Sequence, residues 1–287
     1  MKYQFIERQR SQFKVSRMCR VLSVSTSGYY AWRERPQSTR SQRQQRLAGS
    51  IQDSFKASHE TYGARRVRAD LLDSGERIGR HTVRRLMQRL GLETKVVKRF
   101  RITTNSRKTI AAPNLLAQDF RAARPDQRWV SDVTFIPTRQ GWLYLAVMID
   151  LFSRTVVGWS MDSRLQRSLV IDALRMALQR RAPTALDLVH SDQGSQYTAA
   201  EYQALVGAHG AQCSMSRKGC CWDNAVAESF FHTLKTELVH HQDYRTRIQA
   251  KTSIFSYIEG FYNRKRRHSF TGNRAPLDFE LCYATNP

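Results

Sequence analysis

Acidic residues are scarce in this sequence relative to basic ones. The 287 residues include 24 Asp and Glu against 47 Lys and Arg, which gives a formal net charge of +23. An excess of positive charge this large says nothing about the fold, but it favours a polyanionic partner. Nucleic acid is the first candidate for that partner, and an anionic membrane is the second.

Long apolar runs are absent, so no segment of the sequence supports a membrane as the partner. The most apolar stretch, Trp142–Ile149, stops at Asp150, whereas a spanning helix needs about 20 apolar residues. The first residues, Met1–Glu7, contain no apolar segment of the signal-peptide type. We therefore expect a cytoplasmic protein with no membrane partner.

The sequence also lacks two common signatures of cofactor binding. Its five cysteines include no C-x-x-C pair, and the adjacent Cys220 and Cys221 are poorly placed to bind one zinc ion. No G-x-x-x-x-G-K-[ST] run is present, so nothing indicates a nucleotide triphosphate site. Reduced thiols with no ligand role are the expected state of the cysteines.

Residues 1–40 are predicted to form a helical leader. An apolar stripe over residues 13–22 is followed by a turn at Ser23–Ser25 and by a second helical piece, which Thr26 can cap. Pro36 ends this piece. The pattern resembles half of a helix-turn-helix, although a helical hairpin with no role in DNA binding fits nearly as well.

Residues 41–95 are predicted to form a helix-turn-helix DNA-binding domain. Apolar residues recur at helical spacing over about 43–57 and 64–72, and a third helix follows Gly79. A short turn that contains glycine and a basic last helix are typical of this motif, and a basic solvated helix with no role in DNA binding is the less favoured alternative. Residues 96–124 lose all periodicity and are predicted to form a basic linker along a phosphate backbone. The outward face of the third helix carries Arg80, His81, Arg84, Arg85 and Gln88.

The pattern changes at Trp129, where apolar and polar residues begin to alternate as in a β-strand. Three strand-like segments end near Met161, and a helix, a strand at Leu186–His190, a second helix, a short strand and a long helix follow. This is the order of the ribonuclease H-like fold. We therefore predict an α/β ribonuclease H-like catalytic core over residues 125–245, in which a mixed five-stranded sheet is flanked by helices. A C-terminal helix and basic tail are expected over residues 246–287.

Three carboxylates and a lysine form a candidate catalytic site in this core. Asp132 lies halfway along the first strand, where an unpartnered buried charge costs several kcal/mol. Asp192 follows the neighbouring strand at a Gly-containing loop, a position that also suits a plain solvated turn. Glu228 lies on the closing helix, which Asp223 is expected to cap, and Lys235 lies about 10 Å further along the same face. Carboxylate oxygens alone are the ligands that Mg²⁺ and Mn²⁺ prefer.

The motifs around these residues resemble a known family. Asp132 in W-x-x-D-x-T, Asp192 in H-S-D-x-G-x-Q-Y and Glu228 in D-N-A-x-x-E-S-F-F are similar to the D-D-E catalytic domain of retroviral integrases and bacterial transposases. Residues 193–227, 35 in all, separate the second and third carboxylates, which is the spacing of this class. The chain resembles in particular the second-frame (OrfB-type) transposases of the insertion-sequence three family. Its ending, F-Y-N-R-x-R-x-H followed by Ala275-Pro276, resembles theirs too.

The resemblance implies a transposase that cleaves the 3′ ends of its element and joins them to target DNA. Asp132, Asp192 and Glu228 would be the catalytic residues and would hold Mg²⁺ or Mn²⁺, as two ions. The implied partners are double-stranded DNA of the element ends and the target, further copies of the chain, and an upstream OrfA-type segment joined by frameshift fusion. A bacterial, nucleoid-associated location follows from the same resemblance. The residues expected to contact DNA are Lys235, Arg80, Arg84, Arg85, Arg264, Arg266 and His268.

Other functions fit these residues less well than that of a transposase. A structure-specific nuclease of the ribonuclease H type would share the carboxylates, but it would not need the basic linker or the helix-turn-helix. A DNA-binding regulator with an inactive catalytic domain is disfavoured because all three carboxylates and the lysine are intact. Tyrosine and serine recombinases use covalent chemistry that would leave the carboxylates unexplained.

Overall fold

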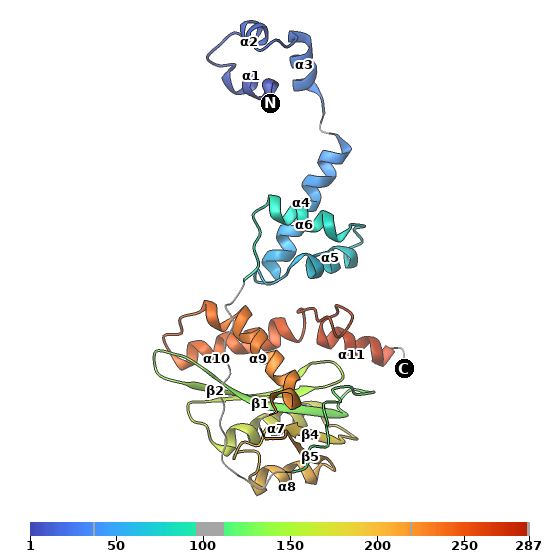
Figure 1. The fold of residues 1–287 in the computed structure, drawn as a ribbon, viewed down its shortest axis with the longest axis vertical. Coiled ribbons are helices and arrows are strands. Elements are labelled where there is room, and N and C mark those ends of the chain that lie inside the picture. Colours follow the sequence, from blue (N-terminus) through green and yellow to red (C-terminus); the bar gives the residue numbers. More distant parts are fainter. Residues whose placement is uncertain (37, 96–111, 219, 286–287) are drawn as a thin grey trace. The chain divides into compact units, whose positions relative to one another are not determined.

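The computed structural model describes residues 1–36, 38–95, 112–218 and 220–285 (Figure 1). The chain divides into two compact units, Met1–Gln52 and Asp53–Pro287. Much of the predicted basic linker, residues 96–111, lies outside the described residues. The domain bounds predicted above therefore stay predictions.

The first unit begins with three short helices around a small core. They are α1 (Lys2–Gln9), α2 (Val15–Val21) and α3 (Thr26–Glu34), of which the last two were predicted. The Ser25 hydroxyl accepts a hydrogen bond from the backbone N–H of Gly28 at 3.0 Å. Ser25, and not the predicted Thr26, therefore caps α3, because the helix begins one residue earlier than expected. The residues of this core are Ile6, Met18, Cys19 and Tyr29.

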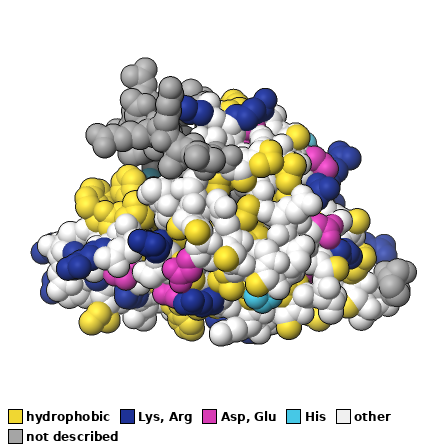
Figure 2. Space-filling view, turned by 90° about the horizontal axis from the view of Figure 1, so that it is seen from below, with side chains coloured by type: hydrophobic (Ala, Val, Ile, Leu, Met, Phe, Trp, Pro, Cys, Tyr) yellow, Lys and Arg dark blue, Asp and Glu magenta, His cyan; other side chains and the backbone are white. Residues whose placement is uncertain are grey.

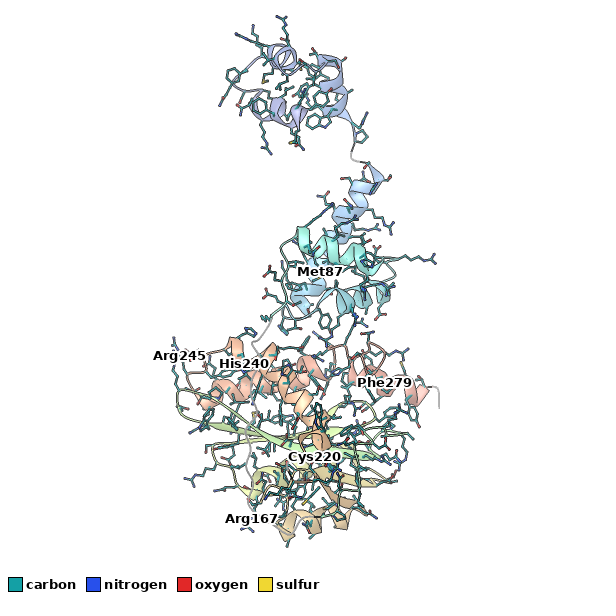
Figure 3. The ribbon with its side chains drawn as sticks, viewed as in Figure 1. Met87, Arg167, Cys220, His240, Arg245 and Phe279 are labelled. Carbon is teal, nitrogen blue, oxygen red and sulfur yellow. The ribbon has the colours of Figure 1, made fainter. Side chains whose placement is uncertain are left out.

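The three helices predicted over residues 41–95 are confirmed. They are α4 (Thr39–Ala57), which crosses from the first unit into the second, α5 (Ala64–Asp73) and α6 (Arg80–Arg89). Helix α6 buries one apolar face that includes Met87 (Figure 3), and Gly91 beyond its end has a φ of 63°. A left-handed glycine at this position is a common helix terminator.

The second unit contains the predicted mixed five-stranded sheet, in the order β3-β2-β1-β4-β5. The first three strands are antiparallel neighbours, and β4 and β5 run parallel to β1. This combination confirms the ribonuclease H-like order inferred from the sequence. The strands are β1 (Arg128–Ile136), β2 (Leu143–Asp150), β3 (Val156–Asp162), β4 (Leu188–Ser191) and β5 (Gln212–Met215).

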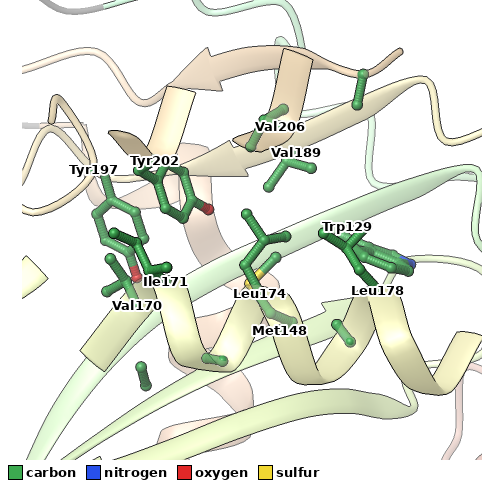
Figure 4. Packing of buried hydrophobic residues seen from close by; sticks show 14 of the residues in the cluster. Trp129, Met148, Val170, Ile171, Leu174, Leu178, Val189, Tyr197, Tyr202 and Val206 are labelled. Carbon is green, nitrogen blue, oxygen red and sulfur yellow. The ribbon is translucent and has the colours of Figure 1, made fainter. Parts of the chain in front are cut away.

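Helices cover both faces of this sheet (Figure 1). One face carries α7 (Arg167–Arg181) and α8 (Ala200–Ala208), and a core that includes Trp129 fills the space beneath them (Figure 4). Gly158 of β3 is required here, because a Cβ atom would lie 2.3 Å from the carbonyl oxygen of Ala173 in α7. The other face carries α9 (Ala225–Glu237), α10 (Arg247–Phe255), its π-helical continuation Ser256–Tyr262 and α11 (Pro276–Thr285).

Two features describe the exterior of the chain. Within the described part of the chain, no helix combines the length and the apolar character needed to cross a membrane. On the face drawn in Figure 2, lysine and arginine side chains are interspersed with acidic and apolar ones, so positive charge does not form one continuous patch there.

Candidate active site

The pairing of β1 with β4 brings Asp132 and Asp192 to the same level of the sheet. In this parallel pair Val130 lies opposite His190, and the same register continued by two residues places Asp132 opposite Asp192. Strand β4 ends at Ser191, so Asp192 is the first residue beyond it. The two predicted carboxylates therefore meet at the carboxyl end of a parallel pair, which is where α/β sheets bind ligands.

Glu228 and Lys235 reach the same place from α9, which packs on β1. The charge of Asp132 interacts with Asp192, with Glu228 and with Lys235. The Nζ atom of Lys235 lies 5.2 Å from the ring centroid of Phe135, further along β1. The structure thus brings all four predicted residues into one electrostatically coupled site.

Burial disfavours the charged forms of all three carboxylates. It raises the pKa of Asp132 well above its usual value, and the negative charge of Asp192 raises this pKa further. Burial likewise raises the pKa of Asp192 and the pKa of Glu228, and it lowers the pKa of Lys235. Three such carboxylates need additional positive charge if they are to ionise together.

The donor set fits a hard divalent cation in its chemistry, but not as a closed group of ligands. All three side chains offer carboxylate oxygens, which Mg²⁺ and Mn²⁺ prefer. Across the described ranges, however, no three His, Cys, Asp or Glu side chains form a group that could hold a metal ion. The site therefore supplies ligands of a suitable kind, but among the described residues they are not grouped around one common centre.

The loop after β4 fixes the orientation of Asp192. Its Oδ1 atom accepts a hydrogen bond from the backbone N–H of Gly194 at 2.9 Å. A Cβ atom at Gly194 would lie only 3.0 Å from that oxygen and 2.6 Å from Nε2 of Gln196. Further along the loop, the hydroxyls of Tyr197 and Ser131 are 2.9 Å apart, which ties the loop to β1 beside Asp132.

His190, which precedes Asp192 by two residues, holds β4 to β5. Its Nδ1 atom lies 2.8 Å from the hydroxyl of Ser214, and its Nε2 atom lies 3.1 Å from the hydroxyl of Ser216. Burial lowers the pKa of His190 to about 4. Because both ring nitrogens lie within hydrogen-bond distance of serine hydroxyls and burial favours the neutral ring, we assign His190 a structural role in joining β4 to β5.

The structure corrects the expectation that Asp223 caps the long helix. Helix α9 begins at Ala225, and the carboxylate of Asp223 is fully buried instead in a network of donors. The side chains of Arg217, Asn114 and Gln118 donate to it at distances between 2.8 and 3.0 Å. Hydrogen bonds from Arg217 are the main cause of the lowered pKa of Asp223.

Asn224 has a positioning role that was not predicted. Its side-chain amide donates to the backbone carbonyl of Ser131 at 3.0 Å, so it fastens the start of α9 to the strand beside Asp132. Both Asp223 and Asn224 belong to the D-N-A-x-x-E run. The motif therefore contained both residues, but most of their hydrogen-bond partners could not be predicted, because those partners lie between 93 and 109 residues away in the sequence.

The predicted DNA contacts fall into two groups. Arg80, Arg84 and Arg85 of α6 are exposed, as is Arg264 of the C-terminal segment. Arg266 is 4% exposed and donates to the carboxylate of Glu237 at 2.6 and 2.8 Å. The pKa of His268 is lowered to about 2, mainly by burial and then by Arg266. Arg266 is therefore committed to Glu237 and burial favours the neutral form of His268, so the structure gives both residues contacts within the fold, and their binding to DNA stays a prediction.

Models of known protein families agree with this architecture. Family models match residues 42–100 (HTH-like domain), residues 122–221 (integrase core domain) and residues 228–281 (a second integrase core domain model). The catalytic core domain of BIV integrase aligns with 56% of this chain and 97% of its own, at 20% identity and a TM-score of 0.43.

Two relatives match at much higher identity. The transposase InsF for insertion sequence IS3A of Escherichia coli (strain K12) is 44% identical over 283 residues, which is 98% of each chain. An uncharacterized 31 kDa protein of insertion element IS600 from Shigella sonnei is 43% identical over 267 residues, covering 93% of this chain and 98% of the relative. The chain belongs to the family of the IS3 transposases, and its second unit contains their integrase core.

Proposed function

We propose that this chain catalyses metal-dependent cleavage at the 3′ ends of an insertion sequence and transfer of those ends to target DNA. The observation that supports the proposal most directly is that the charge of Asp132 on β1 interacts with Asp192, which follows the neighbouring strand β4, and with Glu228 on α9. In cleavage, the oxygen of a water attacks the phosphate and the 3′ oxygen leaves. In transfer, the freed 3′ hydroxyl attacks a target phosphate and displaces a target 3′ oxygen. Positioning and charge neutralisation are sufficient for both displacements.

Asp132, Asp192 and Glu228 would hold the Mg²⁺ or Mn²⁺ ions, which we propose to be two. When bound, such ions activate the attacking hydroxyl and neutralise negative charge on the phosphate and the leaving oxygen. The Gly194 N–H orients Asp192, and Asn224 fixes the start of the helix that carries Glu228. Lys235 supplies positive charge beside Asp132, and we propose that it binds a phosphate of the DNA end.

We further propose a division of labour along the chain. Residues 41–95 bind element ends through Arg80, Arg84 and Arg85 of α6, which the match to an HTH-like domain supports. Residues 96–124 and Arg264 contact phosphates, and residues 125–245 carry out the chemistry. Joining two ends requires at least two active sites, so the working form is a homo-oligomer on DNA, and an upstream OrfA-type segment is its proposed partner.

Substitution of each carboxylate tests the proposal. Asp132→Asn, Asp192→Asn and Glu228→Gln are each expected to abolish cleavage and joining in Mg²⁺, while affinity for element ends stays close to that of the unsubstituted chain. The matched control is Asp172→Asn, which removes an exposed carboxylate of α7. Joining at the unsubstituted level in any one of the three variants would refute the assignment. A strand-transfer assay also separates the alternatives, because a structure-specific nuclease would cleave without joining and an inactive regulator would do neither.

A further inference from the structure

The three helices of residues 1–36 lie outside the ranges that the family models match. Four residues, Leu22–Ser25, join α2 to α3, and Ser23 among them has a φ of 52°. Helices α2 and α3 share a core with α1, whose Ile6 is fully buried. Two helices around a four-residue turn, supported by a third, are the arrangement of this motif, whereas an isolated hairpin would have no third helix in its core.

One side of α3 is fixed closely against α1. A Cβ atom at Gly28 would lie 2.5 Å from the hydroxyl oxygen of Tyr3, so the side chain of Tyr3 in α1 packs directly over this position of α3. The hydroxyl of Tyr29 donates to the carboxylate of Glu7, and the ring of Tyr29 is fully buried. Because this side is committed to the core, the opposite side of α3 faces solvent.

The solvent side of α3 carries side chains suited to contacts with DNA. Ser27, Tyr30 and Arg33 are exposed on it, and the guanidinium of Arg33 lies 5.6 Å from the ring centroid of Tyr30. Helix α2 contributes exposed Arg17 and Arg20. Hydroxyls and arginines at the start and along the face of a second helix are the groups that contact base edges, and arginines on a first helix contact phosphates.

The charge of this segment points to the same partner. Residues 1–36 contain only two acidic residues, and one of them, Glu7, is occupied by Tyr29 and by Arg10 at 3.3 Å. Such an excess of positive charge favours a polyanion and adds a salt-dependent attraction to phosphates. The basic residues are Lys2, Arg8, Arg10, Lys14, Arg17, Arg20, Arg33 and Arg35.

We propose that α1–α3 form a second DNA-binding module, which places α3 in the major groove of a segment of the element end different from the one bound by α6. Arg17 and Arg20 contact phosphates, and Ser27 and Arg33 contact base edges. The choice of an element end as the DNA rests on the proposed function, but the binding itself does not depend on catalysis. The chain then recognises each end at two places instead of one.

Hydroxyl-radical footprinting of the full chain on an element end, without added divalent metal, tests this inference. The unsubstituted chain is expected to protect two separate segments. The double variant Ser27→Ala/Arg33→Ala should lose protection of one segment and bind the end about tenfold more weakly or worse, whereas Arg84→Ala/Arg85→Ala should lose the other segment. Arg17→Ala/Arg20→Ala should reduce the slope of log affinity against log salt by about 2, that is, about 0.9 for each phosphate contact.

Two controls keep the outcome interpretable. Circular dichroism and thermal unfolding of each variant verify that the helices are intact, and Arg8→Ala on α1 serves as a matched removal of one exposed charge. Asp132→Asn should retain both protected segments, so a failure of the proposed chemistry would leave this result unaffected. An unchanged footprint and affinity in Ser27→Ala/Arg33→Ala would overturn the inference. Loss of the whole footprint in that variant, with its helices intact, would also overturn it, because the two segments would then not be bound independently.

Discussion

The charged form of Asp132 is expected to destabilise the fold when no metal ion is bound. Its pKa is raised by burial and by Asp192, so the unfolded chain releases this proton at a lower pH than the folded chain does. The contribution of the group to folding stability is therefore fully present below its ordinary pKa and is lost as the pH rises through the raised value. Carboxylates with a pKa raised by burial are common at functional sites, where a bound cation can supply the positive charge that stabilises the ionised form.

Asp132→Asn is accordingly expected to raise the melting temperature of the metal-free chain at pH 8, even though it abolishes activity. The asparagine oxygen can still accept the hydrogen bond that Val133 N–H now donates to Asp132 at 2.8 Å. Thermal unfolding in a chelator at pH 5 and pH 8 measures the effect, with Asp172→Asn as the control. A variant that is less stable than the unsubstituted chain at pH 8 would contradict this account.

The contribution of His268 to folding stability is expected to depend on pH in the opposite direction to that of Asp132. Its folded-state pKa is lowered to about 2, so its contribution to stability is present above the ordinary pKa of about 6.5 and is lost as the pH falls below that value. At pH 5 the loss is about 2 kcal/mol, which is 1.5 pH units at about 1.4 kcal/mol each. His268→Gln should remove this part of the acid destabilisation in chemical unfolding curves between pH 5 and pH 7. His81→Gln, on the exposed face of α6, should leave the pH dependence unchanged.

The local sequence pattern was enough to single out residues whose importance is visible within their own strand or helix. Asp132 stands out because a charge in an alternating apolar strand is rare, and Asp192 stands out because a strand ends beside it. The roles of Arg266 and His268 could not be predicted in the same way. An arginine in a basic tail has the same local sequence whether it faces DNA or Glu237, and only the packing of distant segments decides between the two.

Helix α9 is the element on which the site depends, and it is fastened at both ends. Asn224 ties its start to β1, and the buried carboxylate of Asp223 holds the preceding turn to Arg217 and to residues 114–118. At its other end, Glu237 accepts hydrogen bonds from Arg266 and, at 2.8 Å, from the hydroxyl of Tyr257. The start of the helix was predicted within two residues, but the fastening was not, because it joins parts far apart in the sequence.

Asp223→Ala is expected to lower the free energy of unfolding by about 1–3 kcal/mol, because buried donors lose their acceptor. It should also slow joining more than it weakens DNA binding, since Glu228 lies on the helix that begins two residues later. Urea unfolding and single-turnover joining measure the two effects. The control is Asp187→Ala, which removes a half-exposed carboxylate paired with Arg124. Equal joining rates in the two variants would show that the network does not position α9.

At the scale of the second unit, the HTH-like region from Asp53 onward is connected to the catalytic core by specific polar contacts. The hydroxyl of Tyr62 donates to the carbonyl of Lys265 at 2.9 Å and accepts from the N–H of Arg267 at 2.7 Å. The side chain of Arg267 donates to Asp70 of α5 at 2.5 Å, and Arg66 of the same helix lies 3.5 Å from Glu237. The C-terminal segment thus connects the proposed end-binding region to the helix that carries Glu228.

Arg267→Ala should therefore lower the rate of joining per bound end by about tenfold or more, because a small displacement of positioned groups costs this much in rate. Affinity for the end should change little, since Arg267 is not part of the proposed DNA-binding face of α6. Binding by anisotropy and joining under saturating chain separate the two quantities. Arg264→Ala, an exposed neighbour, should have the reverse effect and weaken binding more than joining. A loss confined to affinity in Arg267→Ala would indicate a DNA contact instead.

The contact of Arg66 and Arg266 with the same Glu237 also limits how transposases of this kind can be recombined. A chimera that took its HTH-like region from one relative and its catalytic core from another would bring together halves of two ion-pair sets, centred on Glu237 and on Arg267. Unless residues 66 and 70 of the donor match residues 237 and 267 of the recipient, a buried charge at the junction would lose its partner. If the HTH-like region reads the element ends as proposed, an engineered exchange of that region must therefore transplant these positions, together with Asp73, as one set.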